Sequence, residues 1–137
     1  MNEFIDKNIL EYVESSSQIE PTLLKDLNRE TNLKILNPRM LSGSYQGRIL
    51  SLISKIIKPK MVLEIGTYTG YSALCIAEGL DTNGVIDTID INEELQEIQN
   101  KFFKKSGYVN QINQHIGNAL DIIPTINKKF DLVFLDA

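Results

Sequence analysis

The stretch that most constrains the fold is residues 61–72, which read M-V-L-E-I-G-T-Y-T-G-Y-S. An apolar run ends at an acid, turns on Gly66 and Gly70, and leads into a helical pattern, which predicts a strand, a tight turn and a helix. The first glycine permits the sharp turn, and a helix N-terminus presents free backbone N–H groups to a ligand. The pattern is therefore typical of a nucleotide-binding unit.

The spacing of the glycines distinguishes two classes of ligand. A dinucleotide fingerprint, G-x-G-x-x-G, lets a pyrophosphate approach its middle glycine, but Tyr68 stands at that position here. This argues against a diphosphate and against a nicotinamide dehydrogenase. The run V-I-D-T-I-D supplies Asp90, 20 residues after Gly70, where a carboxylate can accept hydrogen bonds from ribose hydroxyls. Adenosine without a diphosphate suggests S-adenosylmethionine. The alternative is an ordinary βα turn followed by a solvated aspartate.

Alternating strand and helix patterns continue to the end of the sequence. Asn92 with two acids after it predicts a helix start, and K-K-S-G, ending at Gly107, predicts the end of the same helix. Alternation of this kind is typical of an α/β domain with a parallel sheet. The expected strands are near 61–65, 85–90, 111–116 and 131–136, and the expected helices are near 70–79, 92–105 and 118–126.

Three helices are expected before the first strand. Apolar residues recur at helical spacing near the start, S-S-S-Q ends that first helix, and a second begins near Pro21. Residues 33–43 are predicted to be a loop, and a third helix, near 44–57, should cover the sheet with its apolar face. We predict one domain with a helical cap, 1–57, and a cofactor-binding βα half, 58–137. The apolar positions are Phe4, Ile5, Ile9, Tyr12 and Val13 in the first helix and Ile49, Leu50, Ile53, Ile56 and Ile57 in the third.

Composition is that of an ordinary soluble protein, with 42% hydrophobic and 23% charged residues. No apolar stretch reaches membrane-spanning length and the first residues are polar, so a cytoplasmic location is expected. A net charge of -4 disfavours broad electrostatic binding to nucleic acid. The single Cys75 excludes an internal disulfide, and its apolar neighbours predict a buried thiol without chemistry. His115 has no triad partner pattern and is predicted to be structural or solvated.

With these motifs in place, E-I-G-T-Y-T-G-Y-S-A-L resembles the first motif of the catechol and caffeoyl-CoA type O-methyltransferases. P-R-M-L-S-G-S-Y-Q-G-R-I-L, D-T-I-D-I-N, G-N-A-L-D-I-I-P and F-D-L-V-F-L-D-A resemble further segments of that family, in the family's order. The resemblance extends from about Pro38 to Ala137. It implies a Rossmann-like class I methyltransferase fold, in which a parallel sheet follows N-terminal helices. The family normally continues as D-A-D-K after this point, so we expect the C-terminal half of the fold to be absent from this chain.

The resemblance also implies a set of cofactor-binding residues. The amino acid end of S-adenosylmethionine would lie over the turn after the first strand, Asp90 would bind the ribose, and Ala119 would leave room for adenine. Taken from the residues alone, the same positions have simpler readings as loop packing, helix caps or helix formers. The implied residues are Met40, Ser42, Glu64, Gly66, Thr67, Tyr68, Ser72, Asp90 and Ala119.

Asp136 is the residue to which the resemblance assigns chemistry, as a ligand of a divalent ion, Mg²⁺, that holds two adjacent oxygens of the acceptor. Such an ion stabilises the oxyanion of a hydroxyl whose pKa would otherwise be near ~10. Mg²⁺ usually takes more than one protein carboxylate, and the family's lysine base, two residues beyond Asp136, is absent here.

The resemblance thus predicts a S-adenosylmethionine-dependent O-methyltransferase that acts on a catechol-like small molecule. Two alternatives stay open. The same family methylates hydroxylated uridine in tRNA, which the acidic charge disfavours. The chain could instead be a non-catalytic cofactor-binding module, or a misfolding-prone fragment that only forms a homodimer through its open sheet edge.

Overall fold

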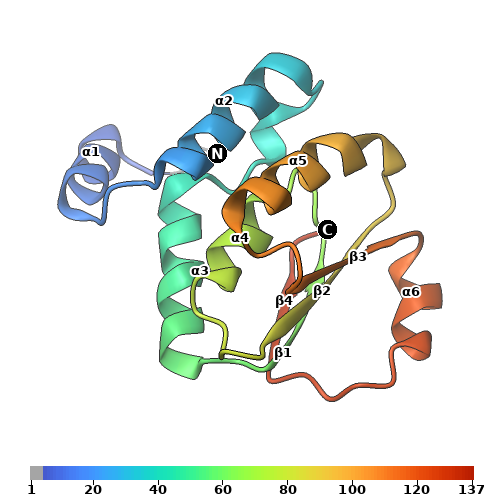
Figure 1. Cartoon of the computed structure of the whole chain (residues 1–137). Coiled ribbons are helices and arrows are strands. Elements are labelled where there is room, and N and C mark those ends of the chain that lie inside the picture. The colour runs from blue at the N-terminus through green and yellow to red at the C-terminus, as the bar shows by residue number, and fades with distance from the viewer. Residues whose placement is uncertain (1–4) are drawn as a thin grey trace.

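The computed structural model describes residues 5–137, so the predicted helical position Phe4 lies outside the described part of the chain. A four-stranded parallel sheet forms the centre, with the strand order β3-β2-β1-β4 (Figure 1). The sheet therefore grows outward from β1 through β2 to β3 before the chain returns to place β4 on the other side of β1. The strands are β1 (Met61–Ile65), β2 (Val85–Asp90), β3 (Ile112–Ile116) and β4 (Leu132–Leu135).

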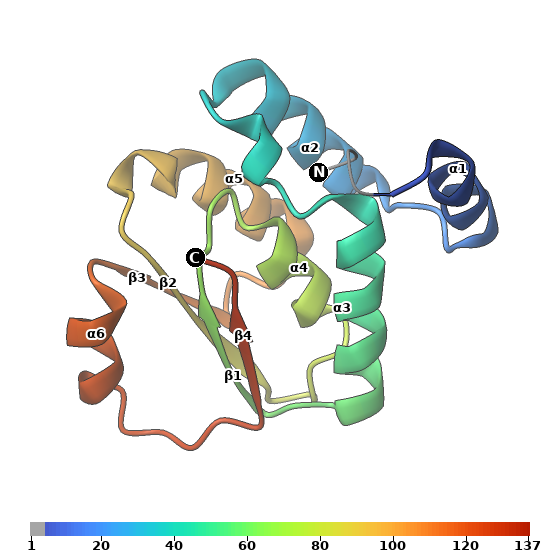
Figure 2. The same cartoon turned by 180° about the vertical axis from the view of Figure 1, so that it is seen from behind.

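Six α-helices surround this sheet in the described residues. Figures 1 and 2 show α3 and α4 stacked beside β1 and β4, with α6 standing apart from them beyond β3. The helices are α1 (Lys7–Ser16), α2 (Thr22–Lys34), α3 (Gly43–Ile57), α4 (Tyr71–Ala77), α5 (Gln96–Ser106) and α6 (Ala119–Ile122). Short 3₁₀ turns occupy Pro38–Met40, Glu93–Leu95 and Ile123–Thr125.

The hydrophobic core lies between one face of the sheet and helices α2 to α5. Val62 on β1, Ile86 on β2 and Ile112 on β3 all point into this layer, because side chains alternate along a strand and these residues share one register row. Phe102 and Phe103 of α5 are 1% exposed and fill the space above them. Cys75 is also buried, as predicted, and burial raises the pKa of its thiol to about 12, so it stays protonated.

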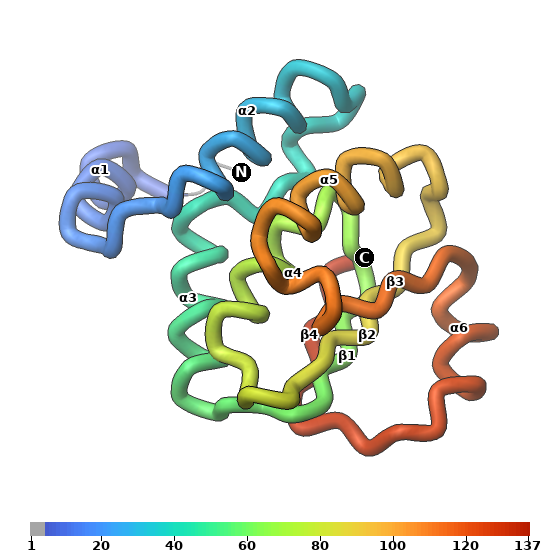
Figure 3. The backbone as a smooth tube through the Cα atoms, viewed as in Figure 1, coloured from blue at the N-terminus to red at the C-terminus, as the bar shows by residue number. Residues whose placement is uncertain are grey.

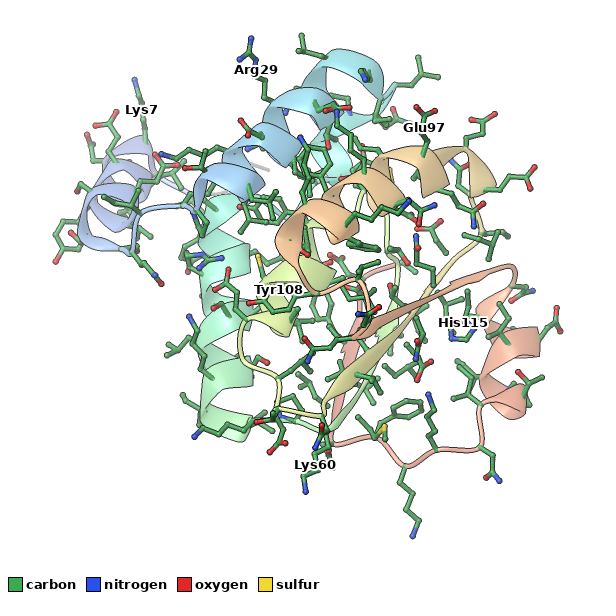
Figure 4. The ribbon with its side chains drawn as sticks, viewed as in Figure 1. Lys7, Arg29, Lys60, Glu97, Tyr108 and His115 are labelled. Carbon is green, nitrogen blue, oxygen red and sulfur yellow. The ribbon has the colours of Figure 1, made fainter. Side chains whose placement is uncertain are left out.

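The opposite face of the sheet carries a charged cluster around Asp87 of β2. Its carboxylate accepts hydrogen bonds from Lys128 at 2.7 Å, from Asn113 at 3.2 Å and contacts His115 Nε2 at 2.9 Å. Burial opposes ionisation, yet the hydrogen bonds from Lys128 and His115 hold the pKa of Asp87 below its usual range. Figure 4 shows His115 on the side of α6. The histidine is thus a structural partner of Asp87, in agreement with the sequence.

Helix α3 turns a different face to the molecule than its apolar pattern predicts. Of the five residues expected to cover the sheet, only Leu50 is buried, and Ile56 is 73% exposed. The buried positions are small: a Cβ on Gly47 would lie 2.7 Å from the Tyr71 ring, and Ser54 donates to the Ile76 carbonyl at 2.7 Å. The predicted face was wrong because close packing against α4 selects small side chains. The exposed members are Ile49, Ile53, Ile56 and Ile57.

A salt bridge fixes this orientation of α3. Arg48 binds both carboxylate oxygens of Glu78, at 2.8 and 2.9 Å, and Ser51 donates to the same carboxylate at 2.6 Å. A bidentate pair of this kind sets direction as well as distance. The other predicted element boundaries agree with the structure to within a few residues, but the loop predicted at 33–43 starts later, since α2 continues to Lys34, and it contains the 3₁₀ turn Pro38–Met40.

Candidate cofactor-binding site

A cavity of about 720 Å³ opens at the carboxyl ends of the strands, the edge at which parallel sheets commonly bind ligands. Figure 3 shows the C-terminal end of the chain arriving beside the loop that follows β1. The wall is built from the segment between α2 and α3, the turn after β1, the end of β2, residues 117–119 and residues 136–137. Segments that are far apart in the sequence therefore meet at one edge of the sheet.

Most residues predicted to bind the cofactor line this cavity. Glu64 does not, because it lies beneath the floor and is 0% exposed. Its role as a direct contact stays a prediction. The predicted residues that line the cavity are Met40, Ser42, Gly66, Thr67, Tyr68, Ser72, Asp90, Ala119 and Asp136.

The two glycines of the turn are required by close contacts as well as by their dihedral angles. Gly66 has φ +103°, and a Cβ there would lie 2.1 Å from the carbonyl oxygen of Asp136. Gly70 has φ +93°, and its Cβ would lie 2.5 Å from the Phe103 ring. Real Cβ atoms do not approach other atoms so closely. The glycines thus let β4 and α5 pack directly against the turn.

Buried hydrogen bonds hold Glu64 under the cavity. Ser72 Oγ and Thr88 Oγ1 each lie 2.5 Å from one of its carboxylate oxygens, and Thr67 Oγ1 lies 2.6 Å from Thr88 Oγ1. Burial raises the pKa of Glu64 to about 7, although the hydrogen bonds from Ser72 and Thr88 act in the opposite direction. The Ser72 hydroxyl therefore donates its hydrogen bond to Glu64, and the residue also forms part of the cavity wall.

Asp90 ends β2 with its carboxylate anchored by two backbone donors. The Tyr68 N–H donates to Oδ2 at 2.6 Å and the Asn92 N–H donates to Oδ1 at 2.9 Å. Each carboxylate oxygen can accept about two hydrogen bonds, so one acceptor site on each oxygen is left for a ligand. The carboxylate is thus held in place and still able to bind a pair of hydroxyls.

The Tyr68 side chain ties the turn to the segment between α2 and α3. Its hydroxyl donates to the Asn37 carbonyl at 2.7 Å, which holds residues 35–42 at the mouth of the cavity. Met40 in this segment is 62% exposed. Ser42 sits before α3 without a side-chain capping bond, so the simpler reading of Ser42 as a helix cap is not realised.

Asp136 reaches the cavity beside Gly66. Its N–H donates to the Ile65 carbonyl at 2.9 Å, which continues the β1–β4 pairing, and its carboxylate accepts from Gln46 at 3.4 Å. Within residues 5–137 there is no group of three or more His, Cys, Asp or Glu side chains placed to hold a metal ion. Among the described residues Asp136 is thus the one predicted ligand at this point, whereas Mg²⁺ usually has more than one protein carboxylate.

Several cavity residues were not predicted from the sequence. Ile91, directly after Asp90, lines the cavity and is 76% exposed. Its place next to the acid predicted to bind ribose was a signal in the sequence that could have identified it. Asn37 contributes its backbone carbonyl and Asn118 caps α6 through its side chain, which receives the Leu120 N–H at 3.0 Å. Backbone contributions leave no trace in a residue pattern, so Asn37 had no usable signal.

Known proteins resemble this chain in both sequence and structure. A family model described as O-methyltransferase matches residues 13–137. The caffeoyl-CoA O-methyltransferase of Zinnia elegans is 36% identical over 124 residues, which are 86% of this chain and 50% of that protein. The catechol O-methyltransferase of Mycobacterium tuberculosis is 34% identical over 101 residues, 73% of this chain and 46% of that protein. The SAH-bound methyltransferase PaMTH1 of Podospora anserina matches with a TM-score of 0.91 and 30% identity, over 100% of this chain and 59% of that one.

The parallel sheet with its cavity at the carboxyl ends is a Rossmann-like methyltransferase fold. The chain belongs to the O-methyltransferase family. It spans about half the length of the curated relatives it matches. In the part of the chain that the structure describes, none of the helices has the length and apolar character needed to cross a membrane.

Proposed function

We propose that the cavity binds S-adenosylmethionine and that the whole protein transfers its methyl group to a hydroxyl oxygen. One observation carries the proposal: nine of the ten residues expected from the sequence line the same cavity, although they come from separate segments of the chain. A resemblance of motifs does not by itself require such convergence. The SAH bound to the Podospora anserina methyltransferase is consistent with a ligand of this class.

The proposed ribose contact is Asp90. Its carboxylate is fixed by the Tyr68 and Asn92 N–H groups, so a vicinal diol would find two acceptor oxygens already oriented. Fixing a binding group before the ligand arrives reduces the entropy lost on binding. A pyrophosphate has no equivalent partner here, because Tyr68 occupies the position where a dinucleotide site has its middle glycine.

The proposed adenine contacts are Ile91 and Ala119. Ile91 presents an exposed apolar side chain directly after the proposed ribose carboxylate, and both residues line the cavity. Covering Ile91 with a flat aromatic ring would remove apolar surface from water, which is favourable by about 25 cal/mol for each Å². The small side chain of Ala119 leaves the width that a planar base needs.

The proposed reaction is an in-line displacement, for which S-adenosylmethionine, when bound, supplies an electrophilic methyl carbon. The residues of this chain would bind and orient. Asp136 lies at the cavity wall, where its carboxylate can accept a hydrogen bond from the hydroxyl of the methyl acceptor and orient that oxygen toward the methyl carbon. We propose a catechol-like acceptor, because the relatives include proteins named as catechol and caffeoyl-CoA O-methyltransferases.

Assistance by a divalent ion stays a prediction. Asp136 is a suitable oxygen donor, but no cluster of three or more acidic, His or Cys ligands accompanies it in residues 5–137. We therefore propose that any ion in the whole protein takes its remaining ligands from outside this chain. The same observation favours a second candidate function, a chain that binds the nucleoside without catalysing transfer.

Calorimetric titration with S-adenosylhomocysteine tests the binding step, because this product analogue has no methyl group to transfer. We expect saturable binding to chain 1–137 and at least about tenfold weaker binding by Asp90→Ala, which loses charged acceptors worth ~1.5–3 kcal/mol each. Asp121→Ala is the matched control, since this exposed acid on α6 does not line the cavity. Failure of the folded wild-type chain to bind, or equal affinity of Asp90→Ala, would contradict the proposal.

A methylation assay separates the two candidate functions. Chain 1–137 is mixed with S-adenosylmethionine, a catechol acceptor and Mg²⁺, and methylated product is measured against a sample lacking protein. Product formation that Asp136→Asn abolishes would exclude the non-catalytic reading. Cofactor binding without product would favour it for this chain.

A further inference from the structure

Tyr68 holds a backbone conformation that a side chain makes unfavourable. Its φ of +49° lies in the left-handed region, which is shared by only one other non-glycine residue among residues 5–137, Lys58. For an L-residue this conformation costs about 1–2 kcal/mol, so surrounding contacts have to maintain it. All three polar groups of Tyr68 are hydrogen-bonded: the N–H to Asp90, the carbonyl to Gln99 and the hydroxyl to Asn37.

The contact to the carbonyl comes from a fully buried glutamine. Gln99 projects from α5, is 0% exposed and donates from Nε2 to the Tyr68 carbonyl at 2.6 Å. A buried side-chain amide is unusual on a helix that otherwise presents charged residues to solvent, and leaving it unpaired would be unfavourable. Gln99 does not line the cavity, so it cannot touch a ligand there.

A second glutamine supplies the partner of the Gln99 amide oxygen. Gln114 of β3 donates from Nε2 to Gln99 Oε1 at 2.7 Å. The Tyr68 carbonyl can only accept, so the NH₂ group of Gln99 has to face it and the oxygen has to face Gln114. A chain of hydrogen bonds, the Gln114–Gln99–Tyr68 relay, therefore runs from β3 through α5 to the turn after β1.

This relay ends at the carboxylate proposed to bind ribose. Both peptide groups that flank the Tyr68 Cα are hydrogen-bonded. Gln99 donates to the Tyr68 carbonyl, and the Tyr68 N–H donates to Asp90 Oδ2. Holding the carbonyl restricts the backbone conformation at Tyr68 and so helps to keep its N–H directed at Asp90, where that N–H occupies one acceptor site of Oδ2. We propose that Gln99 is a positioning residue for the nucleoside site, with Gln114 holding its amide in place through the hydrogen bond to Oε1. The inference rests on the function proposed above.

The test is calorimetric titration of chain 1–137 with S-adenosylhomocysteine. Gln99→Met keeps the volume and removes the donor, and we expect it to weaken binding about tenfold, the equivalent of one positioning hydrogen bond. Gln96→Met, on the same helix but not part of the cavity wall, is the control and should bind like the wild type. Titrations are run well below the unfolding temperature of each variant, so that lost stability alone does not lower affinity.

Gln99→Glu gives a readout that a purely structural role would not move. A protonated glutamic acid can donate to the Tyr68 carbonyl and accept from Gln114, whereas the carboxylate can only accept. A buried carboxyl titrates well above its ordinary pKa of about 4.3. The affinity of Gln99→Glu, divided by that of the wild type at each pH, should therefore fall about tenfold between pH 5.5 and 8.5.

Gln114→Met covers the case in which neither Gln99 variant folds, because Gln114 is only partly buried. It should weaken binding about threefold, since Gln99 Oε1 then loses its hydrogen-bond partner and the amide is held by the Tyr68 carbonyl alone. If the wild type binds and the folded variants at 99 and 114 bind equally well, the positioning role of Gln99 is wrong and the proposed function stands. If the folded wild type itself does not bind, both proposals fail.

Discussion

The turn after β1 and the outer side of α3 and β4 distribute polar and apolar residues in opposite ways. In the turn, polar side chains are inside: Glu64, Thr67, Thr69 and Ser72 are all 4% exposed or less. On α3 and β4, apolar side chains are outside: Leu52, Ile56, Val133 and Leu135 are all 50% exposed or more. Polarity alone therefore does not decide burial in this protein. Buried polar groups are tolerated where hydrogen bonds satisfy them, and apolar groups stay exposed where the chain supplies no neighbour.

The largest effect is expected from filling the space that Gly66 leaves. Gly66→Ala would place a Cβ 2.1 Å from the Asp136 carbonyl oxygen, in a backbone conformation with φ +103°. We expect a loss of more than about 4 kcal/mol in the free energy of unfolding, measured in urea, or no folded protein. Gly107→Ala is the control, because φ there is also positive, +81°, but nothing lies within 4 Å. It should lose about 1–2 kcal/mol. Equal urea midpoints for the two variants would show that the contact with Asp136 is unimportant.

The two faces of α3 give the next largest difference. Leu50→Ala removes a buried side chain and should lower the free energy of unfolding by about 2–4 kcal/mol. Ile56→Ala, further along the same helix, removes a side chain that is 73% exposed, and should change the free energy of unfolding by less than about 0.5 kcal/mol. Urea unfolding of both variants measures the contrast. A large loss in Ile56→Ala alone would mean that the apolar face is covered in solution.

The buried acid of the turn should make stability depend on pH. The pKa of Glu64 is about 7 in the folded chain against an ordinary value of 4.5. Between these values the folded state holds a proton that the unfolded state has released, so the contribution of Glu64 to stability falls as pH rises from about 4.5 to about 7. Relative to Glu64→Gln, the wild type should lose on the order of 3 kcal/mol across this window. Urea midpoints at several pH values measure it, and parallel curves for the two proteins would refute it.

A smaller effect is expected where α2 meets the turn. Thr31 Oγ1 donates to Thr69 Oγ1 at 3.1 Å, and both residues are 0% exposed. Thr31→Val keeps the shape and removes the hydrogen bond, so it should lower the free energy of unfolding by about 1 kcal/mol. Thr22→Val, at the exposed start of the same helix, should stay within about 0.5 kcal/mol of the wild type. Thermal unfolding of the two variants, measured side by side, tests whether the loss of stability is specific to Thr31→Val.

The sequence predicted the elements well because their signals are local. The apolar run of β1 and the acids after Asn92 are both read within a few residues, and Asn92 does cap its helix by accepting the Glu94 N–H at 3.0 Å. Part of the cavity wall was also predictable, since motif order placed Asp90 and Asp136 at strand ends that a parallel sheet brings to one edge.

Longer-range features could not be read in this way. The buried face of α3 depends on how closely α4 approaches, and Gly47 and Ser54 carry no sign of that approach in a one-dimensional pattern. The relay through Gln99 was missed for the same reason. A glutamine between charged residues is typical of a solvated helix face, and only the arrangement of β3, α5 and the turn shows that it is buried.

The strand order has a consequence for the sequence of events in folding. During synthesis β1 can pair with β2, and β2 with β3, as each strand emerges, but the pairing of β1 with β4 joins residues about 70 apart and has to wait. The gap at Gly66 therefore has to stay open until Asp136 arrives to fill it. Pulse-labelling hydrogen exchange should protect the Gly66 amide, bonded to the Ile89 carbonyl, before the Asp136 amide, bonded to the Ile65 carbonyl. β4 thus joins a sheet in which β1, β2 and β3 are already aligned, and its arrival brings Asp136 to the cavity wall.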